Sequence, residues 1–272
     1  MKKGIIIIPA CNEAVSLEHF LPRLRGVARK MENTEIDIIV IDDGSTDNTT
    51  KVVTDAGCQI LSNDENRGLG YSLRRGYQTA VEKGHDFLVS MDSDGQHDVN
   101  LLRPVIEKLS NNVDLITCSR YHPESPRFNP PLDRDLLNIA VTAMIRAVTG
   151  WEQITDPLTG FWGMNQRVAV FLAENLKLER YGTCLEALIK IWYLMDPRPK
   201  LAEIPHPAIY TNRDGDYFLS RVYSAGQQEE RIHRFGTHAR HILKALQDVQ
   251  AAGFEQEVNL AIAEWRQQLL RE

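Results

Sequence analysis

The feature that most limits how this chain can fold is the regular alternation of two kinds of segment over its first 120 residues. Short apolar runs rich in β-branched residues alternate with longer stretches in which apolar residues recur at three- and four-residue spacing. We predict the apolar runs to be strands at 4–10, 36–44, 58–63, 87–92 and 115–121. We predict the stretches between them to be helices at 14–31, 46–56, 69–83 and 99–111. This order is typical of βαβ units, so we expect an α/β fold with a mostly parallel, Rossmann-like sheet flanked by helices.

The rest of the chain has a less regular pattern. In chain order we predict a proline-rich loop, a helix, a tight irregular segment, a buried helix and a late strand, at 122–133, 134–149, 151–165, 182–195 and 202–210. Pro205 and Pro207 give the late strand edge character, because proline cannot donate to a central ladder. From residue 225 onward the sequence is polar and helical, and we expect this tail to pack on the main domain or on a partner.

Composition excludes several classes of protein. The formal charge is −6, from 31 basic and 37 acidic residues, and no basic run stands out, so we expect no nucleic-acid partner. The four cysteines lie far apart without a CxxC pair, which indicates reduced thiols in a cytosolic protein. No run reaches the roughly 18 apolar residues of a membrane span. We therefore expect a soluble, cytoplasmic protein, and attachment to the face of a membrane stays open.

Polar residues gather where four of the predicted strands end. "PACNE" follows the first strand, "DDGSTD" the second and "DSDGQHD" the fourth, and Arg120 comes at the end of the fifth. Each cluster alone is compatible with an ordinary turn or helix cap. Ligands of parallel α/β sheets bind at the carboxyl ends of the strands, however, and these four ends meet at one edge. The sequence therefore predicts a binding site there.

The acidic pair Asp92 and Asp94 indicates what this site binds. Two carboxylates at i and i+2 on a strand end can turn to one ion, and such oxygen ligands suit Mg²⁺ or Mn²⁺. Gln96 adds a neutral oxygen. The same spacing occurs at Asp133/Asp135 and Asp214/Asp216, but only the first pair follows a strongly apolar strand.

A metal held by two carboxylates implies a ligand that carries negative charge, and a diphosphate fits this description. Arg120, Arg134 and Arg213 each offer a fork of donors to a phosphate, although any one of them could instead form a surface ion pair.

Six ordered motifs resemble those of family 2 glycosyltransferases with the GT-A fold. They are "IIIIPACNE", "VIDDGSTDNT", "NRGLGYSLRRGYQTA", "VSMDSDGQHD", "CSRY" and "DPLTGF". Within that family the chain most resembles the dolichyl- or polyprenyl-phosphate mannosyltransferase branch. The resemblance covers residues 4 to about 216, so it implies a glycosyltransferase domain over 1–216, with a nucleotide-sugar half at 1–120 and an acceptor half at 121–216. Residues 217–272 then form a C-terminal helical extension.

The resemblance also implies roles for individual residues. The nucleotide end would be formed by Pro9, Asn12, Glu13, Asp42, Asp43 and Gly68, with Asp42 reading the base and Gly68 allowing close backbone approach. Asp92, Asp94 and Gln96 would bind the metal and the diphosphate, while Arg120, Arg134 and Arg213 hold the acceptor phosphate and the donor diphosphate. Asp156 and Glu186 match acidic positions near the acceptor.

Three positions depart from the family pattern. Cys11 replaces an aromatic residue, Leu158-Thr159 replaces the commoner Val-Ser, and the late element "RDGDYFLS" lacks a lysine. The last departure bears on the acceptor more than on the donor.

These implications lead to an expected reaction. It is an inverting, metal-dependent transfer of mannose or glucose from a nucleoside diphosphate sugar, GDP-mannose or a UDP-sugar, to a polyprenyl-phosphate-type acceptor. A phosphate acceptor needs no general base, whereas a sugar hydroxyl would need Asp156 or Glu186 to take its proton.

Two other functions compete with this reaction. A nucleotidyltransferase would need a glycine- and lysine-rich loop near the first strand, and "PACNEAVSL" offers none. A non-catalytic module that binds sugar nucleotides stays an alternative, which the intact Asp92 and Asp94 disfavour.

Overall fold

The computed structural model describes residues 1–128, 132–209 and 228–269. In these residues a seven-stranded sheet has the order β3-β2-β1-β4-β7-β5-β8, and β7 runs antiparallel to both neighbours while the other pairs are parallel. Its strands are β1 (Lys2–Ala10), β2 (Thr34–Asp42), β3 (Gln59–Ser62), β4 (Phe87–Ser90), β5 (Leu115–Ser119), β7 (Trp162–Asn165) and β8 (Leu201–Pro205). Two short strands, β6 (Arg127–Phe128) and β9 (Ala208–Ile209), pair separately. The predicted α/β fold with a mostly parallel sheet is confirmed.

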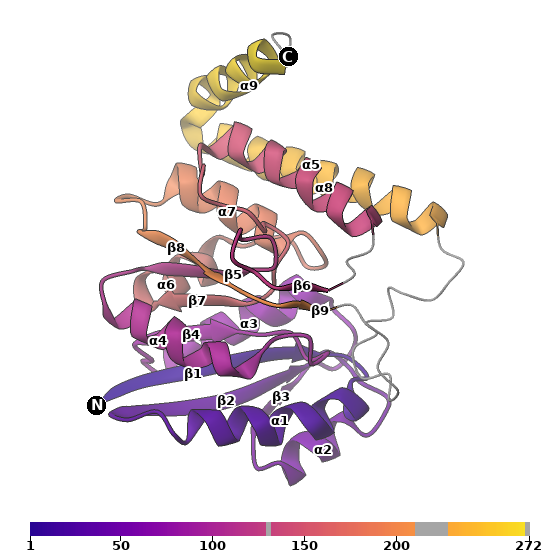
Figure 1. Cartoon of the computed structure of the whole chain (residues 1–272), viewed down its shortest axis with the longest axis vertical. Coiled ribbons are helices and arrows are strands. Elements are labelled where there is room, and N and C mark those ends of the chain that lie inside the picture. The colour runs from indigo at the N-terminus through magenta and orange to yellow at the C-terminus, as the bar shows by residue number, and fades with distance from the viewer. Residues whose placement is uncertain (129–131, 210–227, 270–272) are drawn as a thin grey trace.

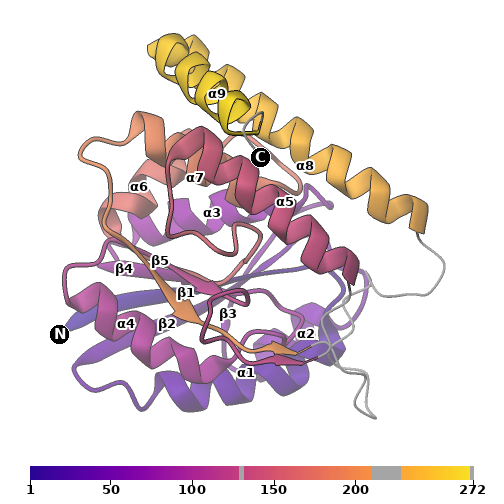
Figure 2. The same cartoon turned by 45° about the horizontal axis from the view of Figure 1, so that its top comes forward.

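Helices cover both faces of the sheet (Figure 1). One face carries α1 (Ala14–Ala28), α2 (Thr49–Asp55) and α4 (Leu102–Ser110), the last preceded by the 3-10 turn η1 (Val99–Leu101). The other face carries α3 (Leu69–Glu82), α6 (Gln166–Asn175) and α7 (Thr183–Leu194). An outer layer of α5 (Leu132–Thr149), α8 (Gln228–Val249) and α9 (Glu255–Leu269) lies over α7, as Figure 2 shows from a second angle.

The four successive isoleucines of β1 explain its central place. Successive side chains of a strand point to opposite faces of the sheet. Ile5 and Ile7 therefore join the core under α3 and α7, and Ile6 and Ile8 join the core under α1 and α4. All four side chains are completely buried. A strand buried on both faces has a continuous apolar sequence instead of an alternating one.

The second half of the chain differs from the prediction in two places. The segment predicted to be irregular, 151–165, ends in the strand β7, and helix α6 follows it directly. Asn165 begins this helix, since its side chain accepts a hydrogen bond from the Val168 N–H. The prediction of the late strand at the sheet edge is confirmed by β8.

The C-terminal tail packs on the main domain, as one of the two predicted arrangements requires. Ile242, Ala245, Leu246 and Val249 of α8 are buried in the core that contains α7. The π-helical turn η3 (Gln250–Phe254) joins α8 to α9, where Val258 is also buried. The four cysteines are free thiols, as predicted.

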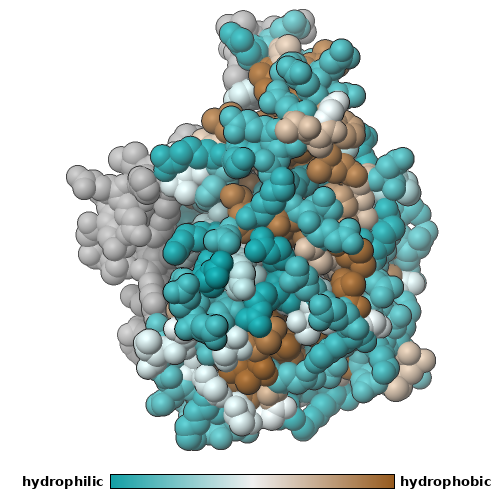
Figure 3. Space-filling model, turned by 180° about the vertical axis from the view of Figure 1, so that it is seen from behind, coloured by the Kyte–Doolittle hydropathy of each residue, from teal (hydrophilic) through white to brown (hydrophobic). Residues whose placement is uncertain are grey.

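The surface is mixed in character. On the face seen in Figure 3, hydrophobic residues form separate patches among hydrophilic ones, and several lie toward the C-terminal helices at the top. Within the described parts of the chain, we find no helix whose length and apolar character would let it cross a bilayer.

Candidate active site

The loops after β1 and β2 are joined at the carboxyl edge of the sheet. Asn12, which has a positive φ of 56°, accepts hydrogen bonds at Oδ1 from the backbone N–H groups of Thr46 (2.7 Å) and Asp47 (3.2 Å). The N–H of Glu13 donates to Thr49 Oγ1 at 2.9 Å. Pro9 is buried in β1 opposite Ile41 of β2. The three residues predicted from "PACNE" therefore join two strand ends into one rigid surface.

Asp42 and Asp43 are both buried, and each organises a different loop. Asp42 accepts from the Ser45 N–H and from the hydroxyls of Thr50 and Ser62, at 3.0, 3.0 and 3.5 Å. Asp43 accepts from the N–H groups of Arg67 (2.9 Å) and Gly68 (2.7 Å) and from the side chain of Asn63 (2.6 Å). Asp43 thus holds the loop that leads into α3.

Gly68 is required for a reason that the sequence did not indicate. Its φ is 100°, and a Cβ there would lie 2.5 Å from the carbonyl oxygen of Glu179 and 2.8 Å from the Arg180 side chain. The close approach that glycine allows in this structure is to the segment before α7. The expected approach to a nucleotide stays a prediction.

Asp92 and Asp94 lie in the loop after β4, which ends at Ser90, two residues earlier than the predicted strand. The Asp92 side chain keeps 41% of its surface exposed, and the Gln96 N–H donates to Asp94 Oδ1 at 3.0 Å. Although part of the side chain is exposed, the protein around the Asp92 carboxylate displaces water from it and raises its pKa, and the nearby Arg120 opposes this effect. Burial also raises the pKa of Asp94, and the negative charge of Asp92 raises it further. Two carboxylates that repel each other at a sheet edge are a donor set that a divalent cation would stabilise.

The protein supplies few donors to such a cation. No group of three or more His, Cys, Asp or Glu side chains with metal-binding geometry occurs in the described ranges. Asp92 and Asp94 therefore fit a hard cation that takes its other oxygens from a ligand and from water, which is the usual situation of Mg²⁺.

His97 and Gly160 hold Asp92 from two sides, and neither was predicted to be part of the site. His97 accepts the Asp92 N–H at Nδ1 (3.0 Å), and its Nε2 lies 3.4 Å from Asp92 Oδ2. Burial lowers the pKa of His97 to about 4, so the ring is neutral at pH 7. A Cβ on Gly160 would lie 2.4 Å from Asp92 Oδ1. The motif "DPLTGF" contained this glycine, but only the fold of β7 brings it to Asp92.

Arg120 and Asp156 form a buried ion pair next to the acidic loop. Arg120 donates from Nε to Asp156 Oδ2 (2.7 Å) and from Nη2 to Oδ1 (3.0 Å), and its backbone N–H adds a third bond at 3.1 Å. Asp156 is fully buried, while the Arg120 side chain keeps 18% of its surface exposed. Asp156 therefore fixes the plane of the guanidinium group.

Glu186 is not brought to the acidic loop. It lies in α7 with 1% of its side chain exposed, and its Oε1 accepts from Lys190 Nζ at 2.5 Å. Both carboxylate oxygens also accept backbone N–H groups, from Lys177 and Leu178, at 2.9 Å. The structure gives this residue contacts that support the fold. Arg134 lies in the first turns of α5, and Arg213 lies outside the described residues.

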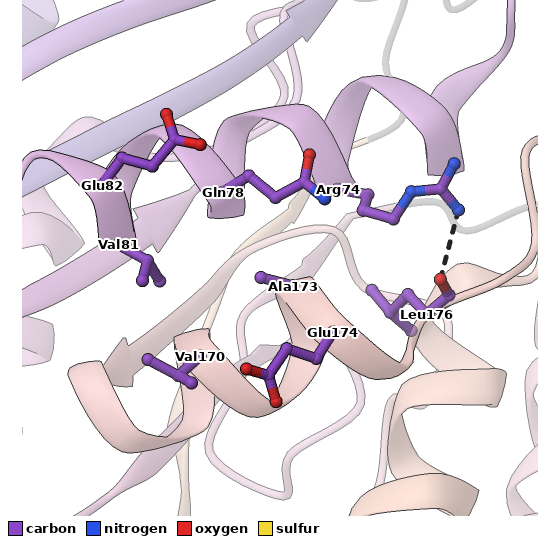
Figure 4. Close-up of a pocket in the computed structure, with 8 residues that line it drawn as sticks. All are labelled: Arg74, Gln78, Val81, Glu82, Val170, Ala173, Glu174 and Leu176. Atoms are coloured by element: carbon purple, nitrogen blue, oxygen red, sulfur yellow. Dashed lines mark hydrogen bonds between the residues drawn. The ribbon is translucent and has the colours of Figure 1, made fainter.

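Two surface cavities lie away from Asp92 and Asp94. The first, of about 500 Å³, is a groove between α3 and α6 in which Arg74 donates to the carbonyl oxygen of Leu176 (Figure 4). The second, of about 370 Å³, lies by the end of β3 and is lined by Asn63, Arg67, Tyr71 and neighbouring polar residues. Asn63 and the Arg67 N–H both bind Asp43, so this second cavity adjoins the nucleotide end predicted from the sequence.

The chain is similar in sequence to several known sugar transferases. The chain is 28% identical over 235 residues to a UDP-N-acetylglucosamine–dolichyl-phosphate N-acetylglucosaminyltransferase of Methanococcus voltae. The match covers 79% of this chain and 88% of that relative. It is 32% identical over 162 residues to an undecaprenyl-phosphate mannosyltransferase of Micrococcus luteus, covering 58% of this chain and 64% of that one.

A dolichol-phosphate mannosyltransferase of Pyrococcus furiosus is 28% identical over 210 residues, and the match spans 75% of this chain but only 55% of that relative. Among solved structures, a glucosyl-3-phosphoglycerate synthase from Mycobacterium tuberculosis, in complex with Mn²⁺, UDP and glucosyl-3-phosphoglycerate, has a TM-score of 0.63 at 17% identity. The likeness covers 91% of this chain and 80% of that one, and it shows the GT-A fold. The sequence model of the family described as "Glycosyl transferase family 2" matches residues 5–171, and the chain belongs to this family of glycosyltransferases.

Proposed function

We propose that this glycosyltransferase moves a sugar from a nucleoside diphosphate sugar to a polyprenyl-phosphate-type acceptor, with inversion at the anomeric carbon and with Mg²⁺ or Mn²⁺ as cofactor. The observation that carries the proposal is the pair of mutually repelling carboxylates, Asp92 and Asp94, beside the Arg120–Asp156 ion pair. The relatives named above as polyprenyl- or dolichyl-phosphate transferases support the acceptor class.

Asp92 and Asp94 would hold the cation, with Gln96 next to them. When bound, the cation neutralises charge that grows on the departing diphosphate. His97 Nε2 lies 3.4 Å from Asp92 Oδ2, and Gly160 leaves space for Oδ1, so both would lower the cost of ordering this carboxylate around the ion. Asp156 keeps the Arg120 guanidinium in one orientation, and we assign Arg120 to the phosphate groups. Arg134 and Arg213 are further candidates for phosphate binding.

The nucleotide end would be built from the surface that Asn12 and Glu13 form with the loop after β2. Asp42 accepts three hydrogen bonds, and because a carboxylate has about four acceptor sites, it keeps room for one bond to a base. Both uracil and guanine offer an N–H to such an acceptor. The donor is therefore proposed as GDP-mannose or a UDP-sugar.

The state of the two acceptor-side acids supports a phosphate acceptor. A hydroxyl acceptor needs a carboxylate that can take a proton in the transition state. Asp156 is paired in bidentate geometry with Arg120, and Glu186 is buried against Lys190, so each already binds a cation. A phosphate is an anion before it reacts and needs no such base. We propose that the protein meets this acceptor at a membrane surface.

The test uses the purified protein, short-chain polyprenyl phosphate and a panel of UDP- and GDP-sugars with Mn²⁺, Mg²⁺ or EDTA. The expected result is metal-dependent release of the nucleoside diphosphate and a prenyl-phosphate sugar whose anomeric configuration is opposite to that of the donor. Transfer that continues in EDTA would contradict the metal site. Transfer to a free sugar hydroxyl but not to the lipid phosphate would contradict the acceptor class.

A further inference from the structure

The segment before α7, residues 176–182, contacts the first turns of α3 along its whole length. The Gly70 N–H donates to the carbonyl oxygen of Arg180 (3.2 Å), and the Tyr71 N–H donates to that of Glu179 (2.9 Å). Farther along the same helix, Arg74 donates to the Leu176 carbonyl at 3.2 Å, which Figure 4 shows as the dashed line. The start of α3 is therefore bound to this segment by backbone and side-chain hydrogen bonds.

Two glycines make this contact very close. A Cβ on Gly68 would lie 2.5 Å from the Glu179 carbonyl oxygen, and a Cβ on Gly70 would lie 2.2 Å from that of Leu178. Gly68 is also the residue whose N–H binds Asp43 at 2.7 Å. A shift of the 176–182 segment would therefore move the loop that Asp43 holds.

The 176–182 segment is itself held by Glu186 and Lys190 of α7. Glu186 accepts the N–H groups of Lys177 and Leu178, one on each carboxylate oxygen, at 2.9 Å. Lys190 Nζ lies 2.5 Å from Glu186 Oε1 and so balances the charge of this carboxylate, and it also donates to the Asn175 carbonyl oxygen at 2.8 Å. Both side chains are almost completely buried, so neither can exchange its partner for water.

Helix α8 completes this arrangement at two points. Asp248 Oδ2 lies 3.2 Å from Lys190 Nζ and gives this buried ammonium a second carboxylate. A Cβ on Gly182 would lie only 2.1 Å from His241 Nδ1, so α8 packs directly against the end of the segment. Both residues belong to a part of the chain that lies beyond the family match at 5–171.

We propose that α8 is a positioning element of the donor site. Asp248 and His241 hold the 176–182 segment, and this segment holds the first turns of α3 beside Asp43, so that α8 raises the affinity for the nucleoside diphosphate. The inference rests on the proposed function, because Asp43 lies in the loop after β2 that forms the proposed nucleotide end, and it binds the N–H of Gly68. It gives the C-terminal extension a role in substrate binding in addition to its role in the hydrophobic core.

The test compares Asp248→Asn, His241→Ala and the double variant with the parent protein. Lys244→Gln is the matched control, because Lys244 also binds Asp248, at 3.1 Å, but is 59% exposed and contacts the outer oxygen. Calorimetric titration with UDP and GDP in Mn²⁺, well below the melting temperature of each variant, gives the dissociation constants. Hydrogen exchange gives the protection of the amides at 68–71 and 177–180.

We expect each single variant to bind the nucleoside diphosphate about threefold to tenfold more weakly, and the double variant more weakly still. Amide exchange should become faster at 177–180 and at 68–71, and Lys244→Gln should match the parent in both measurements. A purely structural role would lower the melting temperature of the variants without changing the nucleotide dissociation constant of the folded protein.

Two outcomes would contradict the proposal, and they can be told apart. If the parent binds UDP or GDP and both single variants bind it equally well, α8 does not position the donor site, and the proposed function stands. If the parent binds no nucleoside diphosphate in Mn²⁺, the proposed function is wrong, and this inference is wrong with it.

Discussion

Two acidic pairs, one in the loop after β4 and one between α7 and α8, are in opposite electrostatic states. Asp92 and Asp94 stand in a loop without a lysine partner, and burial raises the pKa of both. Glu186 and Asp248 share the buried ammonium of Lys190. Burial acts to raise the pKa of Asp248 as well, but hydrogen bonds from Lys244 and Lys190 outweigh it and hold the pKa below its usual value.

The difference separates carboxylates whose contacts support the fold from those to which we assign a ligand. A compensated pair contributes to the structure and has no reason to bind another cation. A pair whose pKa stays raised despite a nearby arginine costs stability when ionised, and carboxylates perturbed in this way are typical of functional sites. The two pairs should therefore respond in opposite ways to substitution, one in activity and the other in stability.

The largest expected effect is on turnover. Asp94→Ala removes one of two proposed metal ligands and should reduce metal-dependent transfer by about 10³-fold, which corresponds to about 4 kcal/mol of transition-state stabilisation. Steady-state rates at saturating Mn²⁺ measure this effect. Asp98→Asn is the control, since Asp98 caps η1 through the Asn100 N–H and should leave the rate near that of the parent. Full activity of Asp94→Ala would remove the basis of the proposed metal site.

The next effect is on stability, in the other acidic pair. Lys190→Met leaves Glu186 buried without its cation and should lower the free energy of unfolding by about 3 kcal/mol. Urea titration followed by circular dichroism measures the change. The double variant Lys190→Met/Glu186→Gln should recover part of the loss, because no buried charge is then left uncompensated. A loss below 1 kcal/mol in the single variant would show that water reaches Glu186.

A smaller effect is expected from a methyl group placed against Asp92. Gly160→Ala puts a Cβ 2.4 Å from Asp92 Oδ1 and should weaken Mn²⁺ binding and turnover by about tenfold. Gly163→Ala is a matched control in the following strand, since its Cβ would lie 2.4 Å from Val105 Cγ1, far from any proposed ligand. Both variants should lose stability, but only the first should lose metal affinity in a calorimetric titration. Equal metal affinity in the two would mean that Gly160 does not position Asp92.

The smallest effect concerns the pH dependence of stability. Because the folded-state pKa of Asp94 is raised, its ionisation disfavours the folded state at neutral pH, and this cost disappears as the pH falls below the usual value of 3.8. Asp94→Asn keeps the acceptor for the Gln96 N–H and should melt about 2 °C higher than the parent at pH 7 in EDTA. The difference should vanish in acid. A variant that melts at or below the parent temperature at pH 7 would contradict the repulsion between the two carboxylates.

The sequence predicted the parts of the molecule whose signal is local. Five strands were predicted because each is an apolar run, and the acidic loop was predicted because it follows one of them. The ends of the predicted strands were less accurate, since β4 stops at Ser90 and leaves Asp92 in the loop. Strand β7 was not predicted because its four residues, Trp162–Asn165, are too few to show a period and follow an irregular segment that contains a proline and a glycine.

The parts that depend on tertiary contact could not be predicted. Glu186 resembled an acceptor-side acid, and only the fold shows that Lys190, one helical turn later, and two backbone amides occupy it. The glycine of "NRG" was recognised as a close-approach position, but its neighbour, the 179–180 backbone, is more than one hundred residues away in the chain. The contact between Gly160 and Asp92 is equally nonlocal.

The antiparallel strand β7 has a consequence for how the molecule can be divided. It occupies the position between β4 and β5, so two strands encoded before residue 120 are joined through one encoded forty residues later. A fragment ending at residue 120 would leave the backbone N–H and C=O groups of β4 and β5 that pair with β7 without partners, and other chains could add strands there. Exchanging the first 120 residues with those of a relative would likewise place the relative's counterpart of Asp92 against Gly160 of this chain. The segments before and after residue 120 are therefore interlocked in one sheet, and they have to be inherited or engineered as a unit.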